Sequence, residues 1–124
     1  MNRLIALLSA VLLACSVAAA DSDAAAFRAA QKGGQLRLTA ASYDRLLSSP
    51  RNYSVSVLLT AMAPQFGCQP CATFAPEHAL VAKAWKDTKD KQGVEHFFGV
   101  VDFSDAREVF ARVCRPQKTW LSLV

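Results

Sequence analysis

The sequence is too short for two ordinary domains, for an eight-stranded α/β barrel or for a complete dinucleotide-binding enzyme, because it has 124 residues. It contains no internal repeat and no low-complexity tract. With 52% hydrophobic and 19% charged residues, it also lacks the composition of a disordered polymer. We therefore expect one small folded domain.

The sequence has only a small excess of positive over negative charge. A nucleic-acid-binding face needs a dense array of Lys and Arg, whereas the formal net charge here is +4. Four lysines between positions 83 and 91 alternate with two aspartates, which is typical of the solvated face and end of a helix. The sequence also has no glycine-rich phosphate loop, no carboxylate pair and no Ser/His/Asp constellation. We therefore expect no nucleic-acid partner and no cofactor.

Long apolar runs are confined to the N-terminus. Arg3 is followed by a run from Leu4 to Ala20 without a charge, which ends in three alanines. This pattern is typical of a cleaved secretory signal over residues 1–20. An uncleaved anchor is the alternative, because the run is at the lower limit for spanning a bilayer. No later run reaches 18 apolar residues, so no membrane span is expected in residues 21–124. Behind a secretory signal, this part of the chain is therefore expected in a compartment where disulfides persist.

Cysteine is also scarce, with four in the whole chain. Cys15 lies in the predicted signal, which leaves Cys68, Cys71 and Cys114. An odd number of cysteines argues against a static disulfide framework, because one thiol is left without a partner cysteine. Cys68 and Cys71 form a C-x-x-C pair, and Cys114 is expected to take no part in its chemistry.

Apolar periodicity predicts alternating strands and helices. The expected strands are 36–38, 53–61, 97–103 and the start of another at 119–124, and the expected helices are 40–47, 68–89 and 105–113. We divide the chain into a signal, 1–20, an N-terminal arm or weak helix, 21–35, and a domain, 36–124. The alternation implies an α/β fold with a parallel core and helices on both faces, with chemistry where the second strand meets its helix.

Helix ends and faces are predicted from single residues. Thr39 is expected to cap helix 40–47, and Ser104 to cap helix 105–113. Pro76 should kink helix 68–89, because proline lacks a backbone donor. The inner face of that helix is predicted to comprise Phe74, Leu80, Val81, Ala84 and Trp85.

The C-x-x-C pair is the motif that indicates a chemistry. In the first turn of a helix, this spacing brings both sulfurs within disulfide range, so a Cys68–Cys71 disulfide is expected. The N–H groups and dipole of a helix start lower the pKa of Cys68 and favour its thiolate. Cys68 would attack a partner thiol or disulfide, and Cys71 would resolve the mixed disulfide.

Two other interpretations of the pair remain open. One is half of a zinc site, completed by Cys114 and by His78 or His96. No second closely spaced ligand pair exists, and His78 is seven residues from Cys71 on the same helix, so we expect no metal. The other is an inert structural disulfide.

The string from Cys68 to Pro76 resembles the active-site helix of thioredoxins, including the proline five residues after the second cysteine. Two features depart from that pattern. Gly67 replaces the usual tryptophan, and the preceding strand has no acidic residue to serve as the buried proton acceptor. Broad reductase activity is therefore not expected.

A larger set of motifs covers about residues 36–113. It comprises Leu58-Leu59-Thr60-Ala61, Phe66-Gly67-Cys68-x-x-Cys71, Phe74-x-Pro76-Glu77, Ala82-x-x-Trp85 and Phe98-x-x-Val101-Asp102-Phe103. Together these motifs resemble the lumenal thioredoxin-like domain of the oligosaccharyltransferase gamma subunit, in its fungal form. The resemblance implies a three-layer thioredoxin-like fold with a central mixed sheet. It implies an accessory role in N-glycosylation, at the lumenal side of the endoplasmic reticulum membrane, beside the other subunits of the complex.

The resemblance also implies how the site is used. Cys68 and Cys71 would capture cysteine-containing nascent polypeptides as transient mixed disulfides and so keep nearby acceptor asparagines accessible. Phe66, Gln69 and Pro70 would contact the captured chain, together with Pro116, which aligns loosely with the family's cis-proline. Relative to the family, the chain is expected to be truncated. It would lack the last strand and helix of the domain and the membrane helices. Association with a membrane would occur only through that missing C-terminal region.

Two other functions compete with this one. The first is a stand-alone secretory thiol-disulfide oxidoreductase of the thioredoxin type, and the second is a peptide-binding module with an inert disulfide. Separately, Asn52-Tyr53-Ser54 matches the acceptor pattern for N-glycosylation, so Asn52 is a candidate glycosylation site.

Overall fold

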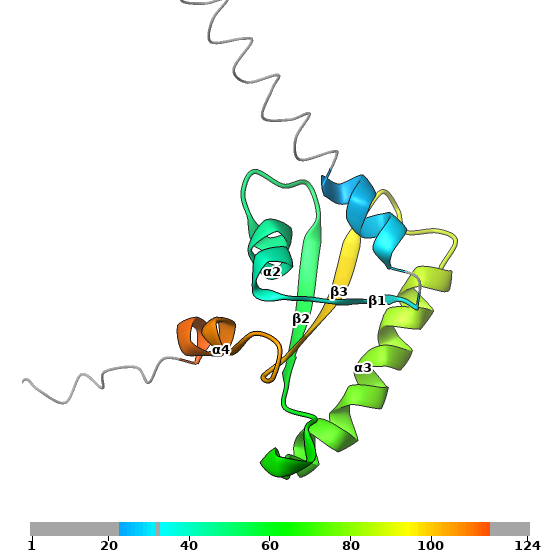
Figure 1. Cartoon of the computed structure of the whole chain (residues 1–124). Helices are drawn as coiled ribbons and strands as arrows, with labels where there is room; N and C mark the ends of the chain where they lie inside the picture. Colours follow the sequence, from blue (N-terminus) through cyan, green and yellow to red (C-terminus); the bar gives the residue numbers. More distant parts are fainter. Residues whose placement is uncertain (1–22, 32, 115–124) are drawn as a thin grey trace, which may run out of the picture.

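The computed structural model describes residues 23–31 and 33–114. The predicted signal 1–20, Pro116 and the predicted strand 119–124 lie outside the described residues. Figure 1 shows a helix over residues 23–30 followed by the remaining elements. In chain order these are β1 (Gln35–Arg37), α2 (Ala40–Leu47), β2 (Ser54–Thr60), the 3₁₀ turn η1 (Pro64–Phe66), α3 (Gln69–Asp87), β3 (His96–Asp102) and α4 (Arg107–Val113).

The three strands of the described chain form one parallel sheet in the order β1-β3-β2. The central strand, β3, pairs with β2 over seven positions, from Ser54 opposite His96 to Thr60 opposite Asp102. It is apolar and mostly buried, as expected for a parallel strand covered on both faces. Because the strands are parallel, β2 and β3 both end at the edge of the sheet where α3 and α4 begin.

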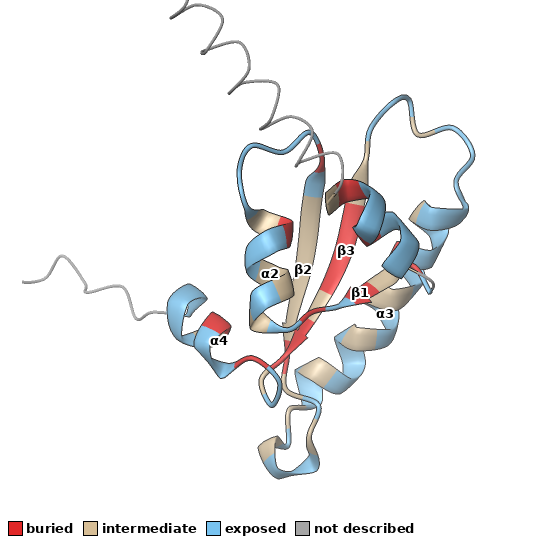
Figure 2. Cartoon of the chain, turned by 45° about the horizontal axis from the view of Figure 1, so that its top comes forward, coloured by how far each residue is buried: buried red, intermediate tan, exposed pale blue. Residues whose placement is uncertain are grey.

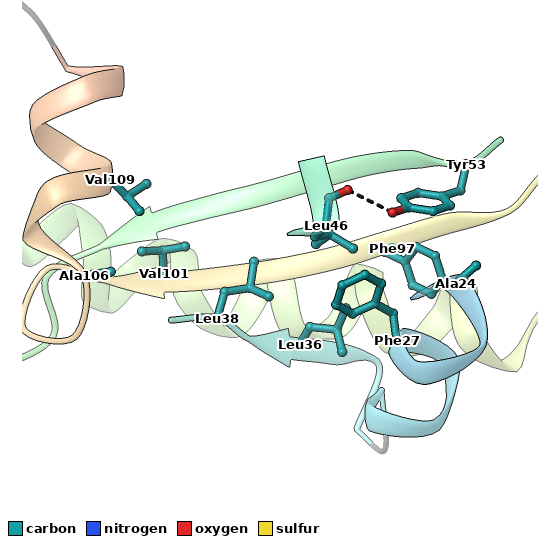
Figure 3. Packing of buried hydrophobic residues seen from close by; sticks show 10 residues of the cluster. All are labelled: Ala24, Phe27, Leu36, Leu38, Leu46, Tyr53, Phe97, Val101, Ala106 and Val109. Carbon is teal, nitrogen blue, oxygen red and sulfur yellow. Dashed lines mark hydrogen bonds between the residues drawn. The ribbon is translucent and has the colours of Figure 1, made fainter. Parts of the chain in front are cut away.

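The hydrophobic core lies on one face of this sheet (Figure 3). Tyr53 packs edge-on against Phe97, with ring centroids 5.0 Å apart, and its hydroxyl donates to the Leu46 carbonyl at 3.1 Å. Helix 23–30, α2 and α4 cover this face. The buried cluster comprises Ala24, Phe27, Leu36, Leu38, Leu46, Tyr53, Phe97, Val101, Ala106 and Val109.

Helix α3 lies on the other face of the sheet and is largely exposed (Figure 2). Its buried residue is Ala82, which lies against Gly34. Gly34 has a φ of +93°, and a Cβ there would lie 2.8 Å from the Ala82 carbonyl carbon and from the Lys83 nitrogen. The missing side chain therefore allows the chain before β1 to touch the backbone of α3.

The α/β fold class is confirmed, and the strands and helices predicted between residues 36 and 113 are found close to their predicted bounds. Thr39 caps α2 as predicted, since its hydroxyl accepts from the Ser42 N–H. Helix 23–30 lies within the predicted arm and contributes Ala24 and Phe27 to the core. The three described strands are all parallel, so an antiparallel strand of the expected mixed sheet is not among them.

Two local predictions are wrong. Phe74, Leu80 and Val81 are 55%, 69% and 57% exposed and do not form the inner face of α3. The helix faces the sheet instead through His78 and Trp85, whose rings contact β3. Helix α4 is also capped by Ala106 rather than Ser104, since a turn at the end of β3 occupies the intervening residues.

No helix in the described parts of the chain is long and apolar enough to cross a membrane.

Candidate functional site

The cysteine pair lies where the chain passes from β2 into α3. Residues 61–67, which we call the site loop, connect the two and contain the η1 turn. Gly67 ends that turn in the left-handed region, with φ +54° and ψ +31°. A glycine adopts this conformation without strain, and it directs the chain into α3 at Cys68.

Cys68 is the N-cap of α3 and Cys71 lies in its first turn. The two form a disulfide, as the spacing predicts, with their Cα atoms 5.2 Å apart. Both residues are half-buried. The Cys68 Sγ also accepts a hydrogen bond from the Cys71 backbone N–H at 3.2 Å. When the disulfide is opened, the same N–H and the helix dipole stabilise negative charge on Cys68.

The chain segment that contains the pair carries no formal charge. From Asn52 to Pro76 the sequence contains no Asp, Glu, Lys or Arg. An open hollow of about 230 Å³ lies beside Cys68, lined by the site loop, Gln69 and Ala72. At its rim Met62 is 49% exposed. A surface formed by uncharged residues thus borders the sulfur that a partner thiol would reach.

The predicted contact residues differ in how they are placed. Gln69 and Pro70 are exposed in the first turn of α3. Phe66 is half-buried, and its ring packs edge-on against Phe103 with centroids 5.2 Å apart. Pro116 lies outside the described residues.

A buried carboxylate at the end of β3 was missed by sequence reasoning. Asp102 is 9% exposed, and its Oδ2 accepts the N–H of Met62 in the site loop at 3.0 Å. Its Oδ1 accepts the Ser104 N–H at 2.9 Å. Burial raises the pKa of Asp102, but these hydrogen bonds and the charge of Arg37 together lower it below its usual value. An acidic residue ending an otherwise apolar strand was the signal that could have found it.

The two histidines lie in the layer between the sheet and α3. His78 Nδ1 is 2.6 Å from Gln35 Nε2, and the His96 ring nitrogens lie 2.6 Å from Ser54 Oγ and 2.9 Å from Ser56 Oγ. Burial lowers the pKa of both imidazoles. Among the described residues, no three His, Cys, Asp or Glu side chains gather as a metal site would require.

The remaining candidates lie apart from the pair in the chain. Cys114 is an exposed free thiol at the C-terminal end of α4. Asn52 is exposed in the turn before β2, and Ser54 of the same acceptor pattern begins that strand.

Comparison with known proteins identifies the family. A profile of the OST3/OST6 family, described as a transporter family, matches residues 22–114. The Danio rerio protein named dolichyl-diphosphooligosaccharide–protein glycosyltransferase subunit MAGT1 is 35% identical over 80 residues, 64% of this chain and 24% of that protein. The proteins of the same name from Gallus gallus and Homo sapiens are each 32% identical, over 80 and 76 residues, or 64% and 60% of this chain and 24% and 22% of theirs. The chain thus spans about a quarter of the length of these curated relatives. Since the profile covers most of the sequence, the chain belongs to the OST3/OST6 family.

Proposed function

We propose that this chain is an accessory subunit domain of oligosaccharyltransferase that captures cysteine-containing nascent polypeptides at Cys68. The observation that supports this most is the Cys68–Cys71 disulfide at the N-terminus of α3, in a chain whose relatives are named as glycosyltransferase subunits. The site then lies on the lumenal side of the endoplasmic reticulum membrane, where such a disulfide persists. Its partners are the other subunits of the complex and the emerging chains.

The surface around the pair suits an unfolded chain better than a folded redox partner. Met62 and Phe74 are each about half exposed near the pair in the chain, and no charged residue lies between Asn52 and Pro76. Apolar, adaptable side chains such as methionine bind many sequences with little selectivity. Such a surface favours brief contact with varied polypeptides.

Capture needs no external oxidant. A client thiolate attacks Cys68 Sγ, the client–Cys68 disulfide forms and the Cys68–Cys71 bond breaks. Cys71 leaves as a thiolate and takes a proton from water. Release is the reverse step: Cys71 loses that proton, attacks Cys68 Sγ, restores the original disulfide and frees the client thiolate. Capture oxidises the client sulfur and reduces Cys71, and release reverses both changes, so the complete cycle leaves the client's oxidation state unchanged.

The test is a trapping experiment with the full 124-residue chain, expressed through the secretory pathway and quenched with acid. In the Cys71→Ser variant Cys68 is a free thiolate, which attacks a client disulfide, forms the mixed disulfide and releases one client sulfur as a thiolate. The resolving thiol is missing, so these adducts on Cys68 should accumulate. The matched control is Cys68→Ser, which removes the sulfur that forms the adduct and should give none at this position. Mass spectrometry identifies the captured proteins, and co-purification reports association with the glycosyltransferase complex.

The identity of the adducts decides between functions. Unfolded chains with cysteines near Asn-X-Ser/Thr sites would support the proposal. Capture of dedicated redox proteins alone would contradict it and favour a stand-alone oxidoreductase. If a folded Cys71→Ser variant captures nothing, the disulfide is inert and the proposed chemistry is wrong.

A further inference from the structure

The site loop is attached to the rest of the fold by the corner between β3 and α4. Hydrogen bonds from the Phe66 N–H to the Ala63 carbonyl and from the Gly67 N–H to the Pro64 carbonyl fix the loop's own shape. They do not connect it to the sheet. That connection is made by Asp102, whose Oδ2 accepts the N–H of Met62 at 3.0 Å across 40 positions of sequence.

Asp102 is itself held rigidly. Its other carboxylate oxygen accepts the Ser104 N–H at 2.9 Å, and its carbonyl accepts the N–H groups of Asp105 and Ala106 at 3.0 and 3.1 Å. Its backbone is also part of β3, opposite Thr60 of β2. A carboxylate fixed in this way can hold the Met62 amide at a defined position relative to the sheet.

The next residue in the chain makes a second attachment. The Phe103 ring meets Phe66 of the site loop edge-on at 5.2 Å and meets Phe110 of α4 at the same centroid distance. The guanidinium of Arg107 lies 5.4 Å from the Phe103 ring centroid. The consecutive residues Asp102 and Phe103 thus contact the site loop near both of its ends, at Met62 and at Phe66. Phe66 lies two positions before Cys68.

We infer that Asp102 is a positioning residue, which holds the site loop so that Cys68 Sγ stays at the N-terminus of α3. This inference rests on the proposed thiol-disulfide chemistry. In the reduced protein, the Cys68 thiolate is stabilised only while its sulfur stays near the first N–H groups of the helix. If the loop is released, the reduced state loses part of that stabilisation, and the disulfide becomes harder to reduce.

The variant that tests this is Asp102→Asn, which keeps the side-chain size but presents an amide NH₂ to one of the two N–H donors. The matched control is Asp105→Asn, three residues later. That carboxylate is half exposed and pairs with Arg37 at 2.9 Å, away from the site loop. Circular dichroism and thermal unfolding establish that each variant is folded.

The readout is the equilibrium between the Cys68–Cys71 pair and glutathione, measured by alkylation and mass spectrometry. We expect Asp102→Asn to lower the equilibrium constant for reduction about two- to fivefold, the range for a charge at a helix terminus. In a Cys71→Ser background, alkylation of Cys68 at neutral pH should slow by a similar factor. Asp105→Asn should match the wild type in both assays. A purely structural role would change the thermal midpoint and leave these two values unaltered.

A second variant covers the case in which Asp102→Asn does not fold. Phe103→Leu keeps an apolar side chain but removes the edge-on contact with Phe66, so it should shift both readouts in the same direction. A folded Asp102→Asn protein with wild-type values overturns the inference, as does a folded Phe103→Leu protein with wild-type values if the first variant is unfolded. Glutathione is used instead of a nascent chain, so these results do not depend on capture. A wild-type pair that glutathione cannot reduce would overturn the inference and the proposed chemistry together.

Discussion

The contact between Gly34 and α3 gives the sharpest prediction about stability. In Gly34→Ala, the new Cβ lies 2.8 Å from two backbone atoms of α3 and 2.9 Å from a third. Backbone atoms cannot rotate away as a side chain does, so the helix must shift. Overpacking of this kind costs about 1–3 kcal/mol, and a non-glycine residue at positive φ costs about 1–2 kcal/mol more. We therefore expect a loss of about 2–5 kcal/mol.

Gly33→Ala is the matched control, because nothing lies within 4 Å of its added Cβ. Its reduced freedom in the unfolded chain should leave stability unchanged or raise it by up to about 1 kcal/mol. Urea unfolding followed by circular dichroism measures both variants. If Gly34→Ala is less than about 1 kcal/mol below Gly33→Ala, the close approach does not hold α3 in place and the reasoning is wrong.

Three further predictions concern single groups. Tyr53→Phe should lower the free energy of unfolding by about 1 kcal/mol, since it leaves the buried Leu46 carbonyl without its hydroxyl donor; an unchanged urea midpoint would contradict this. The pKa of Asp102 is lowered in the folded protein, so its contribution to stability is complete above the pKa of an unfolded aspartate and is lost as the pH falls through the folded value. Urea midpoints measured from about pH 6 down to pH 3 should therefore fall more steeply for the wild type than for Asp102→Asn, and parallel curves would refute the assignment. Asn52 is exposed, and its acceptor pattern predicts that protein from a secretory pathway loses one N-glycan in Asn52→Gln, seen as a mass shift that glycosidase treatment abolishes.

The order of strands and helices could be predicted because it depends on local patterns. Apolar runs at 97–103 and 53–61 and a capping residue at Thr39 are signals contained in a few neighbouring positions. The position of the cysteine pair could be predicted from that order, because functional residues in parallel α/β sheets gather at the carboxyl ends of the strands.

What could not be predicted depends on contacts between distant residues. The buried position of α3 is Ala82, which lies against Gly34, 48 positions earlier, whereas periodicity assigned the buried face to larger residues. Asp102 holds Met62 across 40 positions, and nothing local to either residue indicates the bond. Side-chain partners of this kind become visible only when the strands are placed beside one another.

Pro76 lies inside α3, and it has a consequence for local unfolding. Without an N–H at that position, the carbonyl of Ala72 receives no i to i−4 bond from it. The first turns of the helix, which contain Cys71, are thereby separated from the part where Ala82 lies against Gly34. Segments with few buried contacts open at a lower free energy than the whole domain. The turns that carry the disulfide can thus fray and close again while the core on the other face of the sheet stays folded, and their amide protons should exchange before those of β3.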